Sequence, residues 1–410
     1  PFDMYFVDSS CGPHVQKCKP YDFRWFGNIR EEELQKKADQ LIAEYERSAS
    51  LYAHNVFLAI VGGDFRYNMG QEFNQQYNYK KLIDYVNANG ERYNNAKMQF
   101  GTPKDYFEII RKRTEKFPTL AGDLFPYGDI FTDGHPSYWT GYFTTRPFIK
   151  IMARDLEHQL RTTEILFTLA FNQANHEKNV DSINDLKGNY QQLITARRNL
   201  GLVQHHDAIT GTSRALVMKN YRDRMFESIR NLTQIQQRGL EILMQKFITE
   251  NTEKNFITST FNYVNAELIP TRIIAEFTSS KSAFEYVLFN SLGHERIEIG
   301  SVRVTKPNVR VTDADGNEVA HQVNYLCKRS VENGAIVKLD NEFEVIFVAR
   351  LPALSIVTFI VTYIENGFNE NIATFEVMDD VSKGGDIFIQ NAQMRLEIDA
   401  STGLLKSITS

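Results

Sequence analysis

Two adjacent histidines followed by an aspartate, His205-His206-Asp207, are the residues of this chain best suited to chemistry. Neutral imidazole is a common zinc ligand, and a neighbouring carboxylate can bind a metal or accept hydrogen bonds from sugar hydroxyls. The turn that follows, Thr210-Gly211-Thr212-Ser213, supplies a glycine to end one helix and hydroxyls to begin the next. The motif therefore indicates either a metal and sugar site or two helix-end histidines stabilised by the helix dipole.

Asp64 is a second candidate, because it follows a near-continuous apolar run from His54 to Val61 and the pair Gly62-Gly63. Such a run is typical of a strand that is buried on both faces of a parallel sheet. In open α/β sheets, ligands bind at the carboxyl ends of the strands. Asp64 is therefore a candidate site residue, and the alternative is an aspartate that caps a loop.

Residues 122–147 combine aromatic rings, glycines and aspartates with little periodicity, and they include Asp129 and Trp139. A glycine-rich loop with this many rings is more typical of a binding loop than of a core element. A tryptophan ring can stack on the face of a sugar while carboxylates hold the sugar hydroxyls. The alternative is a loop that plugs the core.

The elements that must position these residues differ along the chain. Residues 1–148 alternate strand and helix signals, with helices expected at 80–88 and 102–110 and a second strand at 97–100. This alternation predicts part of a parallel α/β domain.

In the remainder of the chain, the spacing of apolar residues changes twice. Residues 149–262 carry three long amphipathic stripes, which predict a three-helix bundle that contains the His-His-Asp motif. His206 lies three residues beyond Val203, so we expect it to continue the second stripe toward the packed side. Residues 263–410 alternate with a period of two and contain Asp-Gly and Asn-Gly turn signals, which predict a β-sandwich that is incomplete at its C-terminal end. The fold class is therefore multidomain α/β, then α, then β.

Composition narrows the class of protein. The chain has 410 residues, of which 42% are hydrophobic, which is enough for more than one domain. The net charge is −5 and there is no basic block, so we expect no nucleic-acid partner. No run of about eighteen apolar residues occurs, so we expect no membrane span within this segment.

Two features favour a secreted or luminal protein. Cys11 and Cys18 bracket a short Gly-Pro loop and could form a disulfide, which is typical of an oxidising compartment. Cys327 is left over, either as a free thiol or with a partner outside this chain. Asn231-Leu232-Thr233 is a glycosylation sequon, although sequons often arise by chance.

Four of these segments, in this order and at this spacing, resemble the class II α-mannosidases, family 38 of the glycoside hydrolases. The segments are Gly62 to Tyr67, Gly122 to Asp129, Tyr138 to Pro147 and His205 to Ser213. The short runs Cys11-Gly12-Pro13 and Asp22-Phe23 are more similar to the Golgi branch of the family than to the lysosomal branch.

The resemblance implies a retaining, zinc-dependent exo-mannosidase that trims α-linked mannose from N-linked glycans in the secretory pathway lumen, most naturally the Golgi. Matched position by position, His206 corresponds to a Zn²⁺ ligand and Asp207 to a carboxylate that holds mannose hydroxyls. Asp64 corresponds to the general acid/base, and Trp139 to a ring that stacks on the bound mannose.

Tyr5 and Asp129 correspond to further groups near the sugar. The family also has a His-x-Asp zinc pair and a nucleophilic aspartate followed by proline, and this chain has no matching pair and no Asp-Pro. We therefore expect an internal fragment that is inactive alone and binds zinc weakly, with the nucleophile and other zinc ligands upstream. The alternatives are a non-catalytic glycan-binding relative, a lysosomal-type α-mannosidase with broad specificity, and a purely structural protein.

Overall fold

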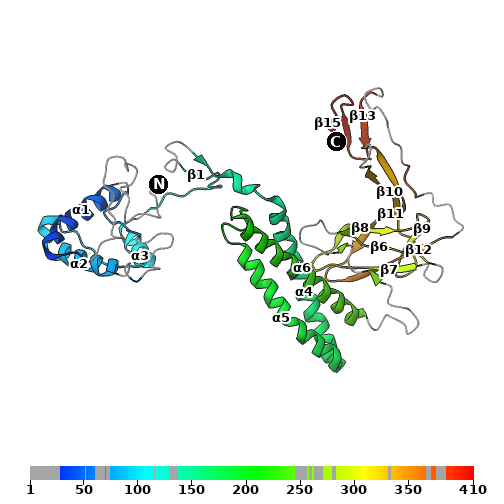
Figure 1. Ribbon diagram of the computed structural model, residues 1–410, viewed down its shortest axis with the longest axis horizontal. Coiled ribbons are helices and arrows are strands. Elements are labelled where there is room, and N and C mark those ends of the chain that lie inside the picture. The colour runs from blue at the N-terminus through cyan, green and yellow to red at the C-terminus, as the bar shows by residue number, and fades with distance from the viewer. Residues whose placement is uncertain are drawn as a thin grey trace. The chain divides into compact units, whose positions relative to one another are not determined.

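The computed structural model divides the chain into two compact units, residues 1–141 and 142–410, which we describe separately (Figure 1). The residues that the structure describes are 28–50, 52–60, 70, 74–114, 116–129, 137–244, 256–257, 261–262, 271–278, 283–330, 334–365, 371–374 and 385–410. Both helices and sheets are present, as the mixed fold class predicts.

Four helices come before residue 114 in the described part of the first unit, three α-helices and a short 3₁₀ helix. They are α1 (Glu31–Ala49), α2 (Asn74–Ala88), η4 (Gly90–Tyr93) and α3 (Pro103–Arg113). Apolar faces of α1 and α2 share one core that includes Leu41, Leu82 and Val86. A capping box begins α3, because Thr102 accepts a hydrogen bond from the Asp105 amide and the Asp105 carboxylate accepts one from the Thr102 amide. These helices confirm the two that periodicity predicts.

The predicted parallel sheet is not formed by the described residues of this unit. Residues 56–60 and 97–100 form no strand, and none of their side chains is buried. A strand needs neighbouring strands to pair with its backbone N–H and C=O groups. The only strand pair in the described part of this unit joins β1 (Gly128–Asp129) to β2 (Ser137–Tyr138), and it is antiparallel. The strand predictions for the described residues of both runs are therefore wrong.

Three long helices begin the second unit: α4 (Pro147–His176), α5 (Val180–Val203) and α6 (Ala215–Met244). Each helix packs against the other two. Their shared core contains the fully buried side chains of Leu156, Leu193, Met225 and Leu232. The structure thus confirms the three predicted helices and their mutual packing.

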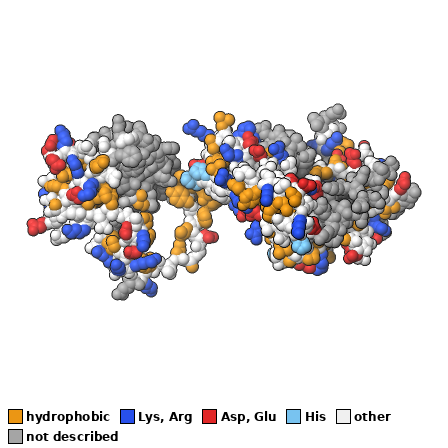
Figure 2. All heavy atoms as spheres, turned by 90° about the horizontal axis from the view of Figure 1, so that it is seen from below, with side chains coloured by type: hydrophobic (Ala, Val, Ile, Leu, Met, Phe, Trp, Pro, Cys, Tyr) orange, Lys and Arg blue, Asp and Glu red, His pale blue; other side chains and the backbone are white. Residues whose placement is uncertain are grey.

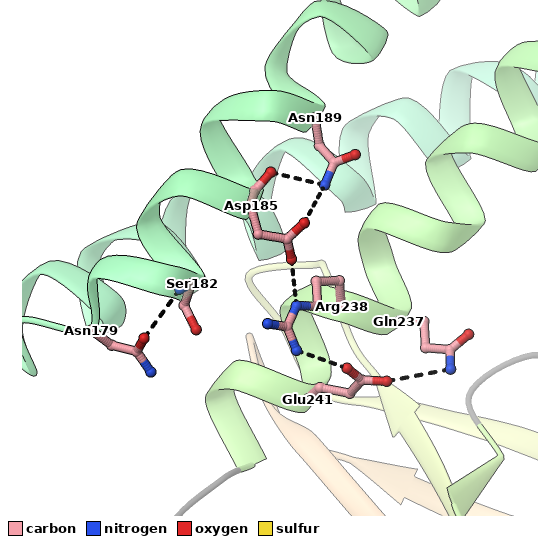
Figure 3. A network of polar contacts seen from close by, with 7 residues as sticks. All are labelled: Asn179, Ser182, Asp185, Asn189, Gln237, Arg238 and Glu241. Atoms are coloured by element: carbon pink, nitrogen blue, oxygen red, sulfur yellow. Dashed lines mark hydrogen bonds and ion pairs between the residues drawn. The ribbon is translucent and has the colours of Figure 1, made fainter.

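A polar network on the surface joins α5 to α6 (Figure 3). The Arg238 guanidinium donates to the Asp185 carboxylate at 2.6 Å and to Glu241 at 3.1 Å. Asn189, one turn beyond Asp185 on α5, donates its amide to the Asp185 carboxylate at 3.3 Å. Because these groups are partly exposed, we expect the network to orient the helices more than to stabilise them.

After the helices the chain forms a β-sandwich. One sheet has the order β10 (His321–Arg329), β11 (Ile336–Leu351), β8 (Arg296–Val304), β6 (Ile274–Ala275), and the other has β3 (Phe256–Ile257), β7 (Ala283–Phe289), β12 (Ile356–Tyr363), β9 (Val309–Asp313). Inward side chains from both sheets, among them Val304, Val345 and Val361, form one core. Gly300 allows close packing, because an added Cβ would lie 2.5 Å from the Phe347 ring. The structure thus confirms the predicted sandwich strands.

The remaining strands in the described part of the second unit form two smaller sheets. They are β4 (Phe261–Asn262) with β5 (Thr271–Arg272), and β13 (Ile387–Gln390), β14 (Arg395–Ile398) and β15 (Leu405–Thr409). Among the described residues, no helix is both long and apolar enough to cross a membrane. The domain limits expected at 148/149 and 262/263 stay predictions.

Candidate functional site on the loop between α5 and α6

The His-His-Asp motif lies on the loop that joins α5 to α6. Helix α5 ends at Val203, and Ala208 turns back into the bundle core, where it is fully buried. His206 is exposed, so the expectation that it continues the packed stripe of α5 is wrong. The periodicity of a helix applies only while the helix continues, and here it stops three residues earlier. The exposure also rules out a buried core histidine.

The side chains of His205, His206 and Asp207 gather on the surface of this loop. Each of the three residues offers one nitrogen or oxygen atom that could bind a metal, and these three atoms lie within 4.8 Å of one another. The Nε2 atom of His205 lies 3.5 Å from Oδ2 of Asp207, and the two imidazole ring centres are 4.5 Å apart. Two imidazoles and a carboxylate are the donor types that zinc prefers. The residues therefore fit zinc in type, and this is the one such group among the described residues.

Hydroxyl groups of the following turn orient Asp207 and the backbone beside it. Thr212 Oγ1 donates a hydrogen bond to Asp207 Oδ1 at 2.9 Å, and the backbone amide of Ser213 donates to the Asp207 carbonyl at 3.0 Å. Thr210 Oγ1 donates to the His206 carbonyl at 2.6 Å. One carboxylate oxygen of Asp207 is thus held in place, while Oδ2 faces His205.

Sequence reasoning assigned the hydroxyls of this turn to helix capping and expected the turn to fix the direction of the polar side chains, but it did not identify Thr212 as the partner of Asp207. An aspartate followed five residues later by a threonine is a weak signal, since only the fold of the turn brings them together. It also missed Arg146 and Lys150, which reach this loop from α4 and have no local sequence signal at all. The motif also contains His205, which has no assigned role and whose Nε2 atom lies 3.5 Å from Oδ2 of Asp207.

Trp139, the predicted sugar-stacking residue, lies in the first unit just after β2. Its side chain is 49% exposed, and its ring meets the Tyr127 ring edge-to-face with centres 5.3 Å apart. The Trp139 amide donates to the Tyr127 carbonyl at 3.0 Å. Because the described rings of this segment are largely exposed, they do not plug a core. The backbone of Asp129 pairs with Ser137 in the β1–β2 ladder.

Most of the other predicted site residues lie in parts of the chain that the structure does not describe. Asp64, Tyr5, Cys11 and Cys18 lie outside the described residues, so their roles and the convergence of Asp64 with His206 stay predictions. Cys327 is exposed on β10 as a free thiol.

The glycosylation sequon lies in the middle of α6. Asn231 is half-buried beside the fully buried Leu232. The Thr233 hydroxyl donates to the Ile229 carbonyl one turn earlier at 3.0 Å, as threonine commonly does inside a helix. This placement favours a chance sequon, and glycosylation of Asn231 stays a prediction.

Comparison with known proteins adds independent evidence. A family model described as the glycosyl hydrolases family 38 N-terminal domain matches residues 4–130, and one described as the alpha mannosidase middle domain matches residues 137–243. Alpha-mannosidase 2 of Spodoptera frugiperda is 37% identical over 437 aligned residues, and alpha-mannosidase 2 of Homo sapiens is 32% identical over 449.

Both alignments cover 100% of this chain, and the chain spans 38% of the length of each relative. A solved structure described as an alpha-mannosidase from Enterococcus faecalis V583 is 16% identical, with a TM-score of 0.48, over 92% of this chain and 40% of that chain. Together the two family models account for more than half of the chain, and the full-length alignments agree with them. The chain therefore belongs to glycoside hydrolase family 38.

Proposed function

We propose that this chain is part of a retaining, zinc-dependent exo-α-mannosidase that trims mannose from N-linked glycans in the secretory pathway lumen, in the Golgi. The observation that supports the proposal best is the exposed cluster of His205, His206 and Asp207, whose donor atoms lie within 4.8 Å of one another on a loop of this family. Such a cluster can hold a cation and a sugar at the same place.

His206 would hold the zinc ion, and Asp207 would accept hydrogen bonds from mannose hydroxyls through Oδ2, because Thr212 occupies Oδ1. Bound zinc would orient those hydroxyls and stabilise negative charge on them. The exposed ring of Trp139 offers a flat apolar face to a sugar.

Asp64 would give a proton to the departing glycosidic oxygen and later take one from water. Retaining glycosidases use two carboxyl groups roughly 5–5.5 Å apart: the protonated one assists the departing oxygen, and the other bonds to the sugar in a glycosyl-enzyme that water then hydrolyses. Tyr5 and Asp129 would lie near the sugar and the acid.

The decisive experiment replaces Asp64 by Asn in the enzyme that contains this chain. Hydrolysis of mannosides with poor leaving groups should fall by about 10²–10⁴-fold, because these substrates need a proton from a general acid. Mannosides with activated leaving groups should be cleaved nearly as fast in the first step. Asp84→Asn is the matched control, since Asp84 is an exposed carboxylate on α2 that pairs with Lys80. Near-normal hydrolysis of poor substrates by Asp64→Asn would remove Asp64 from this role.

A measurement on the unaltered enzyme separates the catalytic proposal from its alternative. Binding of mannosides without any hydrolysis would show a non-catalytic glycan-binding relative. Loss of binding on His206→Ala would then still locate the sugar at the α5–α6 loop.

A further inference from the structure

Two cationic side chains at the start of α4 donate hydrogen bonds to the loop that carries His206 and Asp207. They are Lys150, in the first turn of α4, and Arg146, the residue before the helix. The Lys150 ammonium donates to the Ile209 carbonyl at 2.5 Å. The Arg146 guanidinium donates through Nη1 to the Gly211 carbonyl and, at 3.4 Å, to the Ser213 carbonyl. Hydrogen bonds from charged donors are roughly twice as strong as those between neutral groups. Both cations lie at the start of α4, at least 59 positions before their acceptors.

The backbone of the loop also lies close to the backbone just before α4. Gly211 adopts a left-handed conformation with φ of +73°, and an added Cβ would lie 2.6 Å from the Thr145 carbonyl oxygen. Arg146, the residue that precedes α4, has φ of 48°. The Lys150 ammonium is partly withdrawn from water at this contact, and this burial lowers the pKa of Lys150. The loop therefore rests on α4 in one defined position.

Successive residues of the turn at 209–213 bind partners on two different sides, the cations at the start of α4 and the His-His-Asp motif. The carbonyls of Ile209, Gly211 and Ser213 accept from the α4 cations. The hydroxyls of Thr210 and Thr212, which lie between them, donate to the His206 carbonyl and to the Asp207 carboxylate. A shift of the carbonyls away from α4 would consequently move the hydroxyls that orient the motif.

We propose that Lys150 and Arg146 are positioning residues, which act through the backbone of residues 209–213 to set the direction of the His206 imidazole and the Asp207 carboxylate. This inference rests on the proposed function, in which those two groups bind zinc and sugar. The hydrogen bonds of both cations to this loop end on carbonyl oxygens, so neither is a catalytic residue. Loss of a comparable outer partner typically weakens metal binding by about 10–100-fold.

The test uses the enzyme that contains this chain and four variants of it. Lys150→Met removes the charged donor and keeps an apolar stem, and Lys150→Arg restores a cation. His206→Ala removes the proposed ligand, and Lys219→Met is the control, since Lys219 is an exposed lysine on α6 that pairs with Asp223. The measurements are Zn²⁺ affinity by calorimetric titration and the ¹⁵N chemical shifts of the His205 and His206 rings.

Lys150→Met should weaken Zn²⁺ binding by about tenfold and shift both ring signals, whereas Lys150→Arg should restore both and Lys219→Met should change neither. Unchanged affinity together with unchanged ring signals in Lys150→Met would overturn the inference. If Lys150→Met lowers the unfolding temperature, Lys150→Ala, which also removes the donor, is measured in its place with the same criteria.

The two proposals fail in different ways. Equal Zn²⁺ affinity of the unaltered enzyme and His206→Ala would remove His206 as a ligand, which contradicts the proposed function. The ring signals then decide the positioning role alone: a shift in Lys150→Met supports it, and no shift refutes it.

Discussion

The α5–α6 loop and the aromatic segment at residues 116–143 both carry predicted sugar contacts, but they are held in different ways. In the loop, Ala208 is fully buried and the Asp207 carboxylate accepts a hydrogen bond from Thr212. In the aromatic segment, Phe125 and Tyr138 are 66% and 71% exposed. Its described contacts include the β1–β2 pair and the ring contact between Tyr127 and Trp139.

The difference follows from the chemistry that each region is expected to perform. A metal ligand or a carboxylate must point in one direction to within small tolerances, so its supporting hydrogen bonds have to be complete. A stacking ring needs only an exposed flat face, and it tolerates small rotations. Three substitutions should test this contrast, and a pH experiment on the first unit follows them, from the largest expected effect to the smallest.

Gly211→Ala should have the largest effect. The left-handed backbone disfavours any side chain, and the new Cβ would lie 2.6 Å from a backbone oxygen of Thr145 that cannot easily move. We expect the free energy of unfolding of the bundle to fall by about 2–3 kcal/mol in urea titrations followed by circular dichroism. Gly141→Ala in the aromatic segment is the control, because no atom lies within 4 Å of its added Cβ. Equal losses in both variants would remove the contrast.

Thr212→Val should come second. It keeps the side-chain shape but removes the hydrogen bond to Asp207 Oδ1. Stability should fall by about 1 kcal/mol, and mannoside affinity of the enzyme containing this chain should fall by about tenfold. Thr195→Val is the control, because the Thr195 hydroxyl bonds only to the Gln191 carbonyl of its own helix. Unchanged affinity in Thr212→Val would mean that Asp207 does not need this orientation.

Trp139→Ala should separate binding from stability. Because the ring is about half exposed, the free energy of unfolding should change by less than about 1 kcal/mol, while mannoside binding should weaken clearly. Calorimetric titration with a mannoside and urea unfolding measure the two effects. A large stability loss with unchanged binding would show that the ring is structural.

The smallest effect concerns acid sensitivity of the helices in the first unit. The Asp39 carboxylate accepts hydrogen bonds from Arg92, which lowers the pKa of Asp39 most, and from Tyr93. A carboxyl group with a lowered pKa stabilises the fold above its unfolded pKa of about 3.9, and this contribution is lost as the pH falls through the folded pKa. The urea midpoint should therefore fall below about pH 4 in the unaltered chain and depend less on pH in Asp39→Asn.

The same contact raises the pKa of Tyr93, and a group with a raised pKa stabilises the fold while it keeps its proton. Burial and the Asp39 carboxylate raise the pKa of Tyr93 to about 12, so the phenol keeps its proton and donates to Asp39 throughout the acid range. Tyr93→Phe should also make the urea midpoint depend less on pH and shift it in the same direction as Asp39→Asn does, but by less, because Arg92 remains. An equal shift would make the phenol the main partner of Asp39.

Much of the fold could be predicted from periodicity. The stripes through Leu156, Leu193 and Leu232 predict the three helices, and the alternation through Val345 and Val361 predicts the sandwich strands. The apolar run at residues 54–61 was misleading, because an apolar run does not specify which strands pair with it. The packed direction of His206 was wrong because a helix stripe gives no information beyond the helix end.

The sequence by itself determined helices α2 to α6, the sandwich strands, the donor types of His205-His206-Asp207 and the family, because these depend on residue types at short spacing. Tertiary structure alone decided that Lys150 and Arg146 hold the loop and that Gly211 lies against Thr145. Those contacts join positions at least 59 residues apart, and they exist only after α4, α5 and α6 pack together. Local patterns specify which face of a helix is apolar, but they do not specify which distant carbonyl a surface cation will reach.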